Sequence, residues 1–455
     1  MIRKTERMGI DAPVIDDVDV LVVGGGPGGI GAAVAAARRG MRTMLIERHG
    51  CLGGVATNCL VGIWLGSYSR DGAYPVIGGV FDEIVERMVK EGGAIPARQD
   101  VVGGTRHLGY APWHGRTVPF EYECCKRVTE QVVLDAGVRV RYFTNMIEPK
   151  VAGDRIEGVF VHSANGVEYI RTKVVVDASG DGTVAYLAGC PMVKGRPEDG
   201  LQSAPTLIFT VEDVDSQAFE RHARETGDVR FRQAIAEYEK QAPWPFAFRH
   251  INCCEMPRRG SFFINTGQIL GVDGTNADDI SRAMVEGRQQ ALALMGMLKK
   301  MVPGFEKARL THTASMLGLR DTRRIVGRYW VTVADVTSGV SYDDTVALSG
   351  YQWDMADPKE PSKQRMEGKE IKRPYAEIPY RSLLPQKVEN LIVAGRSVSC
   401  DWDVLGLFRI MPACFAMGQA AGTAAALRKK AALANVNITE LRRCLIADGA
   451  ILSGG

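Results

Sequence analysis

The sequence has few of the residue patterns that mark metal centres. Its 455 residues include ten cysteines and seven histidines. No two cysteines have the C-x-x-C spacing of zinc or iron–sulfur ligands, and the pairs Cys124–Cys125 and Cys253–Cys254 are directly adjacent. We therefore expect no metal site and mostly reduced, structural thiols.

Strong charge and long apolar runs are also lacking. The formal net charge of +3 at pH 7 is too small to favour nucleic acid or an anionic membrane surface. Residues 1–19 are polar and lack the apolar core of a secretory signal. The uncharged run 20–37 contains six glycines and one proline, too weakly apolar to span a membrane. We expect a cytoplasmic protein with neither nucleic acid nor membrane as a partner.

Residues 19–47 have the order of elements that binds a dinucleotide. The run reads as a strand, a glycine turn, a helix and a second strand with an acidic end: Val20–Val23, Gly24-x-Gly26-x-x-Gly29, Ile30–Arg39, Met44–Ile46 and Glu47. Gly24 allows a tight turn, Gly26 lets the backbone approach a pyrophosphate, and Gly29 lets the helix lie close to the strand. The N–H groups at the helix N-terminus favour phosphates. Such a run in this order predicts a dinucleotide site, the alternative being a plain glycine-rich turn.

Glu47 indicates which dinucleotide is favoured. It lies eighteen residues after Gly29 and is placed to accept a hydrogen bond from a ribose hydroxyl. A carboxylate there would repel a 2′-phosphate, so NADP is disfavoured.

The rest of the chain predicts two kinds of lobe. We expect helices at Val80–Glu91, Glu121–Ala136, Asp278–Val302 and Met411–Leu427, and strands at Val138–Phe143, Gly158–Val161, Glu168–Ile170, Val174–Val176, Leu207–Val211 and Ser261–Asn265. Residues 390–396 have the pattern of a buried strand followed by a turn. Prolines, aromatics and charges mix from about Pro191 to Lys387, and Asp354–Arg373 reads as a polar surface excursion. We expect a dinucleotide-binding lobe from residues 1–190 and 388–455, enclosing a separate lobe at 191–387.

Three segments carry a family resemblance: the Gly24 loop, the turn Asp177-Ala-Ser-Gly-Asp-Gly182 and Gly395–Gly422. They resemble the FAD-dependent oxidoreductases of the two-dinucleotide-binding-domain flavoprotein fold. Further marks of one branch are Glu47-Arg48, Leu52-Gly53-Gly54, Ala56-Thr57, Gly318–Arg324, Ile378–Leu384 and Gly418–Gly422. That branch includes stand-alone oxidoreductases and the flavin subunits of heterodisulfide reductases.

The resemblance implies an α/β fold and FAD as the cofactor. The fold is a Rossmann-like FAD-binding domain of the glutathione-reductase or fumarate-reductase type, with an inserted α+β substrate or cap domain. The implied FAD contacts are Gly24, Gly26, Pro27, Gly28, Gly29, Glu47, Arg48, Gly53, Gly54, Thr57, Met146, Ile147, Asp177, Ser179, Gly180, Asp181, Gly395, Arg396, Arg409 and Met411.

Some of these positions have specific expected roles. Asp177 matches a family residue at the ribityl or pyrophosphate region, although an Asp-rich turn held by its own hydrogen bonds is the alternative. Met146 and Ile147 match a segment whose backbone meets adenine. The helix from Met411 would direct its N-terminus at the flavin pyrimidine and stabilise negative charge there. Arg409 would add a full charge, unless it is an exposed or structural arginine.

The electron route of pyridine-nucleotide disulfide reductases is absent from the sequence. Their active cysteines are separated by four residues, whereas Cys51 and Cys59 lie eight positions apart. A second G-x-G-x-x-G is also missing. We expect electrons to come from the substrate, from transiently bound NAD(P)H or from a protein partner.

Candidate catalytic residues are His107, His114, His312, Arg320, Asp401 and Asp403. A histidine has a pKa suited to moving the proton that accompanies hydride transfer, although packed or exposed histidines, His250 included, are the alternative. Arg320, Arg323 and Arg324 would hold a substrate carboxylate, or else pair with Asp321 and Asp335. Asp401 and Asp403 flank Trp402 and would supply a base beside a stacking face, or lie in a solvent loop.

Two functions remain open. The first is an FAD-dependent oxidoreductase that transfers hydride between a small organic substrate and flavin N5. The second is a flavin-carrying electron-transfer subunit of a larger redox complex, with an electron-acceptor protein as its partner. The large middle lobe favours the first, because an electron relay needs little substrate architecture. The sequence leaves an oligomer possible.

Overall fold

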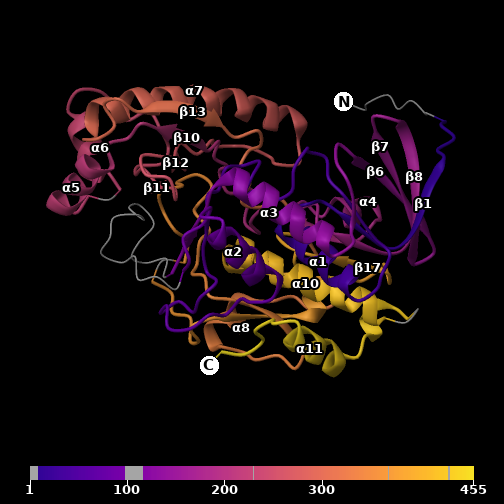
Figure 1. Ribbon diagram of the computed structural model, residues 1–455. Helices are drawn as coiled ribbons and strands as arrows, with labels where there is room; N and C mark the ends of the chain where they lie inside the picture. The colour runs from indigo at the N-terminus through magenta and orange to yellow at the C-terminus, as the bar shows by residue number, and fades with distance from the viewer. Residues whose placement is uncertain (1–8, 98–115, 229, 367, 429–430, 455) are drawn as a thin grey trace.

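The computed structural model describes residues 9–97, 116–228, 230–366, 368–428 and 431–454 (Figure 1). Its largest sheet has seven strands: β1 (Val14–Val23), β2 (Thr43–Ile46), β5 (Arg139–Arg141), β6 (Asn145–Ala152), β7 (Arg155–Ser163), β8 (Gly166–Asp177) and β17 (Leu391–Val393). Their order is β5-β2-β1-β8-β7-β6, and β17 pairs with β8. Strands β5, β2, β1, β8 and β17 run parallel, as the βαβ reading of the sequence requires.

Strand β8 joins two strands that the sequence suggested were separate. Its N-terminal part pairs antiparallel with β7 from Gly166 to Arg171, and its C-terminal part pairs parallel with β17 from Val175 to Asp177. Glu168–Ile170 and Val174–Val176 are therefore one strand of twelve residues. One continuous strand therefore forms a hairpin with β7 at one end and the buried centre of the sheet at the other. The local residue pattern does not show that the two parts are continuous.

Small residues let two helices pack closely over the sheet. Helix α1 (Pro27–Arg38) lies against α10 (Met411–Leu427), as Figure 1 shows at the centre of the molecule. A Cβ atom at Gly418 would lie 2.0 Å from the Gly28 carbonyl oxygen, and one at Gly422 would lie 2.1 Å from that of Ala32. Larger residues at these positions would force the helices apart.

Several shorter elements complete this part of the molecule. They are α2 (Val80–Lys90), α3 (Tyr122–Asp135), α4 (Thr183–Leu187), α8 (Val333–Ser338), α9 (Trp402–Phe408), α11 (Ile438–Ala447), the 3-10 turns η1 (Tyr380–Leu383) and η2 (Leu433–Asn435), and the strand pairs β3 (Ile63–Trp64) with β4 (Val118–Pro119), β9 (Met192–Lys194) with β14 (Arg323–Ile325), and β15 (Thr345–Ser349) with β16 (Ala376–Pro379). The large core under α1 and α10 includes residues of β15 and β16.

A second lobe has its own sheet and core. Its elements are β10 (Phe209–Glu212), β11 (Cys253–Glu255), β12 (Phe262–Ile264), β13 (Arg309–Thr313), α5 (Ser216–Thr226), α6 (Arg232–Glu239) and α7 (Ala277–Met301). The sheet order is β11-β12-β10-β13, and α7 lies along this lobe at the top of Figure 1. Its aromatic core runs from Phe209 to Ala308. The lobe boundaries expected at 190 and 387 stay a prediction.

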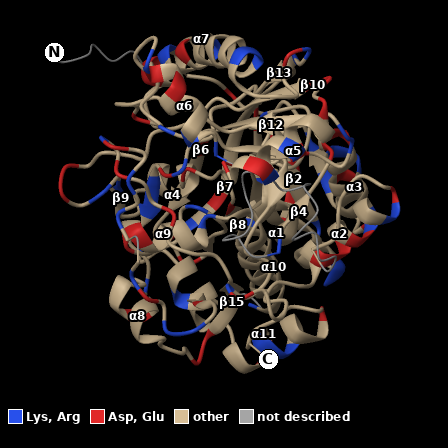
Figure 2. Ribbon diagram, turned by 90° about the vertical axis from the view of Figure 1, so that its left-hand side faces the viewer, with Lys and Arg blue, Asp and Glu red and all other residues tan. Residues whose placement is uncertain are grey.

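Charges are spread over the surface rather than gathered on one face. Lys and Arg alternate with Asp and Glu along the elements in Figure 2, and pairs such as Arg87–Asp135 join α2 to α3 at 2.7 Å. In the described part of the chain no single helix is long and apolar enough to cross a membrane, although α9 and α10, bent by 87° to each other, pass that test together on length and composition alone.

Candidate functional site

A cavity of about 990 Å³ lies where the carboxyl ends of β1, β8 and β17 face the second lobe. One part of its wall comes from the glycine turn and the parallel strands: Gly24, Gly26, Pro27, Gly28, Glu47, Arg48, Gly54, Met146, Ser179, Gly180, Asp181, Gly395 and Arg396. Another part comes from loops and the second lobe, with Arg70, Ile208, His250, Asn252, Tyr351 and Gln364 among its residues. Ligands of open α/β sheets bind at this edge of the strands.

The glycine turn has the geometry expected of a dinucleotide fingerprint. Gly24 has a φ of +104°, and a Cβ atom there would lie 2.5 Å from the Ala178 carbonyl oxygen. A Cβ at Gly29 would lie 1.8 Å from the Gly24 oxygen, so both glycines are required by the fold. At Gly26 the nearest atom to a Cβ is 3.8 Å away, so the surrounding protein leaves the cavity side of this residue open. The first turn of α1, which has no side-chain cap, faces the same cavity.

The Glu47 carboxylate is fixed by the backbone at the end of β2. Its Oε2 accepts a hydrogen bond from Gly25 N at 2.6 Å, and its Oε1 accepts one from His49 N at 2.9 Å. The residue is only 6% exposed and lines the cavity. Each carboxylate oxygen can accept a further bond, so a held and oriented acceptor faces the ligand space.

Asp177 and Asp181, in one turn, have different surroundings. Asp177 is fully buried and lies off the cavity wall, and burial raises its pKa. Its oxygens accept from Ser179 N, Ser179 Oγ and Ala185 N at 2.6–3.1 Å. Asp181 lines the cavity, accepts from Thr322 Oγ1 at 2.8 Å and is ion-paired with Arg396. The geometry therefore offers Asp181 to a ligand and assigns Asp177 to the turn itself.

Helix α10 begins at the other end of the cavity. Its first residue Met411, followed by Pro412, and the buried Cys414 lie at this end, where Met411 and Cys414 line the cavity. Arg409 also lines it, but its Nη2 binds Asp354 through Oδ2 at 2.6 Å and through the carbonyl at 2.7 Å. The charge of Arg409 is therefore matched within the chain, as the alternative of a structural arginine requires.

Several predicted site residues do not line the cavity: Gly29, Gly53, Thr57, Ile147, Asp177, His312, Asp401 and Asp403. Gly53 N and Thr57 Oγ1 donate to the Gly25 and Leu52 carbonyls, so both shape the loop. Ile147 is 40% exposed and lies at a register shift of β6 against β7, between Met146 and Glu148.

The predicted acid–base residues that the structure describes lie away from the cavity wall. Asp401 accepts from Trp330 Nε1 and Val333 N, both at 2.7 Å, so it fastens the start of α8. Asp403 pairs with Arg365 at 3.1 Å. His312 is exposed on β13, with its Nδ1 3.3 Å from Thr210 Oγ1. His107 and His114 lie outside the described residues.

The three neighbouring arginines diverge instead of forming one basic group. Arg320 lines the cavity and binds the Ala204 carbonyl at 2.5 Å. Arg323 stacks over Tyr186 at 4.2 Å. Arg324 is buried and binds the carbonyls of Cys400 and Gly195 at 3.0 and 3.1 Å. The alternative pairing is not seen either, since Asp321 accepts from Trp402 and Ser203, and Asp335 caps α8.

The second lobe contributes residues that no motif pointed to. His250 is 7% exposed, lies against Phe248 with ring centroids 3.7 Å apart, and its Nε2 is 3.3 Å from Arg230. Burial, and then Arg230 and Arg232, lower its pKa to about 3, so its ring is neutral near pH 7. The only sequence signal was the aromatic run that precedes it.

Within the described part of the chain, two amide oxygens on this part of the wall are buried without a hydrogen-bond partner. They are Asn252 Oδ1, from the second lobe, and Gln364 Oε1, from the segment 354–371. Buried polar atoms are rarely left unpaired in a folded protein, and an unpaired group calls for a ligand or water as its partner. This part of the wall therefore offers unpaired hydrogen-bond acceptors, which suit a polar ligand.

Comparison with protein families decides the wider assignment. The model of the FAD dependent oxidoreductase family matches residues 19–445. The chain belongs to this family. The expected family, the α/β Rossmann-type fold class and FAD as cofactor are thereby confirmed, while the narrower branch stays a prediction.

The curated relatives of this FAD dependent oxidoreductase match only part of the chain. Aklavinone 12-hydroxylase DnrF of Streptomyces peucetius subsp. caesius is 28% identical over 211 residues, which are 38% of this chain and 40% of that protein. A dihydrolipoyl dehydrogenase of Trypanosoma brucei brucei is 50% identical over 46 residues, 10% of each chain. A geranylgeranyl bacteriochlorophyll reductase-like protein of Thermoplasma acidophilum has a TM-score of 0.46 at 12% identity, over 96% of this chain and 85% of that one. The chain thus spans about 40% of the length of the first of these curated relatives.

The cysteines of this family member do not form a disulfide in the structure. All ten are free thiols. Cys51 contacts Thr57 and Asn58, whereas Cys59 is buried against the Leu317 carbonyl at 3.3 Å. Burial raises the pKa of Cys59 to about 12, so it is a poor nucleophile at neutral pH. Among the described residues no three His, Cys, Asp or Glu side chains gather in a metal-binding group.

Proposed function

We propose that this chain is an enzyme in which FAD exchanges a hydride, at flavin N5, with a small organic substrate bound in the same cavity. The observation that carries the proposal is the continuity of this cavity, which reaches from the glycine turn at Gly24 to Asn252 of the second lobe. A protein that only relays electrons would need the wall formed by the glycine turn and the parallel strands, which suits FAD. It would not need the wall formed by the loops and the second lobe.

The residues of the first wall suit FAD. Glu47 would accept from the ribose hydroxyls of the adenosine half, the start of α1 beside Gly26 would face the pyrophosphate, and Asp181 would accept from ribityl hydroxyls. The open space beside Gly26 supports this placement, because the protein itself fills none of it. The N-terminus of α10 at Met411 would stabilise negative charge on the reduced flavin ring.

The residues of the second wall would orient the substrate. Asn252 Oδ1 and Gln364 Oε1 offer unpaired acceptors, and the neutral His250 ring can hydrogen-bond without bringing a charge. Apolar side chains at Ile63 and Ile208 on the same wall reduce the access of water. Bound FAD supplies the hydride chemistry, and this wall supplies position.

The test is anaerobic reduction of the FAD-loaded chain by a panel of small metabolites, followed by the loss of flavin absorbance. FAD content is checked by acid extraction and chromatography. Asn252→Ala should weaken reduction by the active metabolite by roughly tenfold, while reduction by dithionite is unchanged. Gln131→Ala, at an exposed position on α3, is the matched control.

Two results would count against the proposal. A purified chain that holds no FAD removes the cofactor assignment on which it depends. Reduction that requires an added protein, with no metabolite effective, would instead favour the flavin-carrying electron-transfer subunit.

A further inference from the structure

Among the residues that the structure describes, Arg70 is a cation on the cavity wall with no carboxylate hydrogen-bonded to it. Its Nη1 donates to the Tyr351 carbonyl at 3.2 Å, and its Nη2 is buried with no hydrogen-bond partner in the described part of the chain. A buried charge is costly unless another charge or several hydrogen bonds compensate it. The cost is visible in the pKa of Arg70, which burial lowers to about 10, so the side chain is still charged at neutral pH.

The neighbouring acid offsets this charge only in part. Burial, which is the larger effect, lowers the pKa of Arg70, whereas Asp71 raises it. The carboxylate of Asp71 accepts from Ser69 Oγ at 2.5 Å and from Ala73 N at 3.1 Å, and so it is held in its own turn. Among the described residues Asp71 gives Arg70 no hydrogen bond, and Nη2 stays unpaired.

Two other arginines that line the same cavity have carboxylate partners. Arg396 is ion-paired with Asp181, and Arg409 with Asp354 at 2.6 Å. Both are therefore matched before any ligand binds. Arg70 lacks such a match in the described chain, and its Nη2 has no acceptor there.

The position of Arg70 separates it from the pyrophosphate end. Its backbone N–H donates to the Pro374 carbonyl at 2.8 Å, which fixes the loop. A Cβ at Gly66, in the same loop, would lie 2.4 Å from the Ile410 side chain and 2.9 Å from Tyr351 Cβ. The loop thus packs beside the residue that precedes α10, whereas the pyrophosphate turn is at Gly24–Gly29.

Building on the proposed function, we propose that Arg70 binds a carboxylate of the substrate, so that the enzyme acts on organic acids. A guanidinium presents N–H donors in a planar fork that matches the two oxygens of a carboxylate. Binding would give Nη2 its missing acceptor and compensate the buried charge. Arg70 would then also orient the substrate relative to the start of α10.

The experiment measures calorimetric binding of carboxylates to the FAD-loaded protein, each beside its neutral amide: acetate and acetamide, succinate and succinamide, benzoate and benzamide. At least one carboxylate should bind ten times or more tightly than its amide. Arg70→Met should weaken that carboxylate by roughly ten- to a hundredfold and leave the amide unchanged. Arg70→Lys, which keeps the charge but loses the fork, should fall between.

Arg42→Met, at an exposed position whose arginine pairs only at the surface, is the matched control and should leave both affinities unchanged. FAD absorbance and Tm show whether each variant is folded, and Arg70→Lys keeps the test decisive if Arg70→Met does not fold. Equal affinity for every carboxylate and its amide in the unmodified protein would overturn the proposal. So would a preference that survives both Arg70 substitutions.

The same data distinguish this proposal from the proposed function. A carboxylate preference that depends on Arg70, in a chain that no metabolite reduces, would support the anion site and reject hydride transfer. A chain that is reduced by a neutral metabolite and shows no such preference would reject the role of Arg70 alone.

Discussion

Asp177 and Asp181 show how a single turn separates structural from ligand-binding carboxylates. Asp177 accepts three hydrogen bonds within the turn, and Asp181 faces the cavity beside Arg396. We expect Asp181→Asn to lower FAD affinity by roughly ten- to a hundredfold, because a charge-assisted bond is lost. Asp177→Asn should instead lower Tm by a few degrees, since an amide nitrogen would meet a backbone donor.

Isothermal titration of FAD into the deflavinated proteins and thermal unfolding of the FAD-loaded ones measure both effects. Each aspartate variant serves as the control for the other. A loss of FAD affinity confined to Asp177→Asn would reverse the two assignments.

The residues that sequence could identify are those whose backbone the motif dictates. Gly24, Gly26 and Glu47 line the cavity, and the sequence points to them because a strand, a glycine turn and an acidic strand end fix one another locally. Arg70 and Asn252 reach the cavity from loops and strands 182 positions apart, so only tertiary packing brings them together. No spacing rule relates such residues, and the substrate wall was therefore not predicted.

At the scale of elements, apolar periodicity predicted the bounds of helices well, whereas the polarity of a segment did not predict its place in the fold. Helix α10 has the bounds that the sequence predicts, and α7 begins and ends one residue earlier than predicted. The segment Asp354–Arg373, expected as a surface excursion, supplies Asp354, Gln364 and Ile371 to the cavity wall. Three of its charged side chains, Asp354, Asp357 and Arg365, form ion pairs with residues distant in the sequence, which a local reading of polarity cannot anticipate.

The start of α10 leads to a prediction about the flavin potential. Arg409 and Asp354 form a matched pair beside Met411. Arg409→Ala should lower the midpoint potential, because Asp354 is left to repel the reduced anion, and Asp354→Asn should raise it. At about 20 mV per kcal/mol for a two-electron couple, and about 1–3 kcal/mol for such a charge, each shift should be roughly 20–60 mV.

Spectroelectrochemical titration of the FAD-loaded variants measures these potentials. The double variant Arg409→Ala/Asp354→Asn should return close to the unmodified potential, since the helix dipole is retained in every case. Shifts of the same sign in both single variants, or none in either, would place the pair away from the ring.

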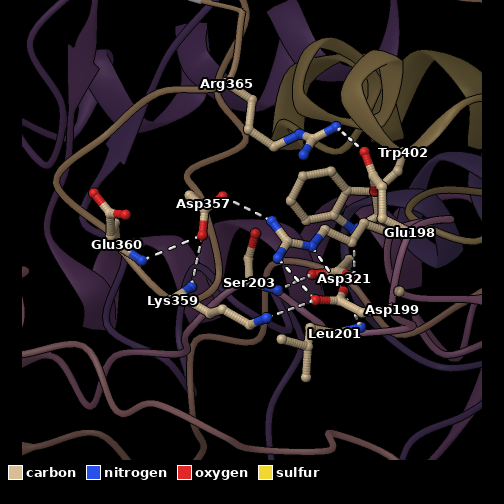
Figure 3. A network of polar contacts seen from close by, with 12 residues as sticks. Glu198, Asp199, Leu201, Ser203, Asp321, Asp357, Lys359, Glu360, Arg365 and Trp402 are labelled. Atoms are coloured by element: carbon tan, nitrogen blue, oxygen red, sulfur yellow. Dashed lines mark hydrogen bonds and ion pairs between the residues drawn. The ribbon is translucent and has the colours of Figure 1, made fainter.

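At the scale of the whole molecule, one polar network holds the segment 354–371 in place over the site (Figure 3). Arg365 pairs with Glu198 at 2.6 Å and Asp403 at 3.1 Å, and lies over the Trp402 ring at 5.4 Å. Arg196 joins Asp199 and Asp357, both at 2.7 Å. On the other side, Arg249 N of the second lobe donates to Ser362 Oγ at 2.8 Å.

This segment therefore connects the two lobes across the cavity. Its chain forms no helix and no multi-residue strand in its described part, and so its position depends on these side-chain contacts. Segments held by few buried apolar contacts open more readily than a core does. We therefore expect the free energy of local opening of this segment to depend on the polar network and to be lower than the free energy of global unfolding.

Arg365→Ala should therefore release the segment without unfolding the protein. Three contacts to the first lobe are lost together, at a cost of about 1–2 kcal/mol, so amide hydrogen exchange of residues 354–371 should speed up by roughly five- to thirtyfold. Lys359→Ala is the matched control, because the Lys359–Asp199 pair, at 3.2 Å, involves a side chain that is 67% exposed and is expected to contribute little. Hydrogen exchange followed by mass spectrometry resolves this segment from the core strands β1 and β8, whose exchange should stay unchanged in both variants. If Arg365→Ala accelerated exchange equally in β1 and β8, the segment would share the stability of the whole fold, and the ion pairs would not be what holds it over the cavity.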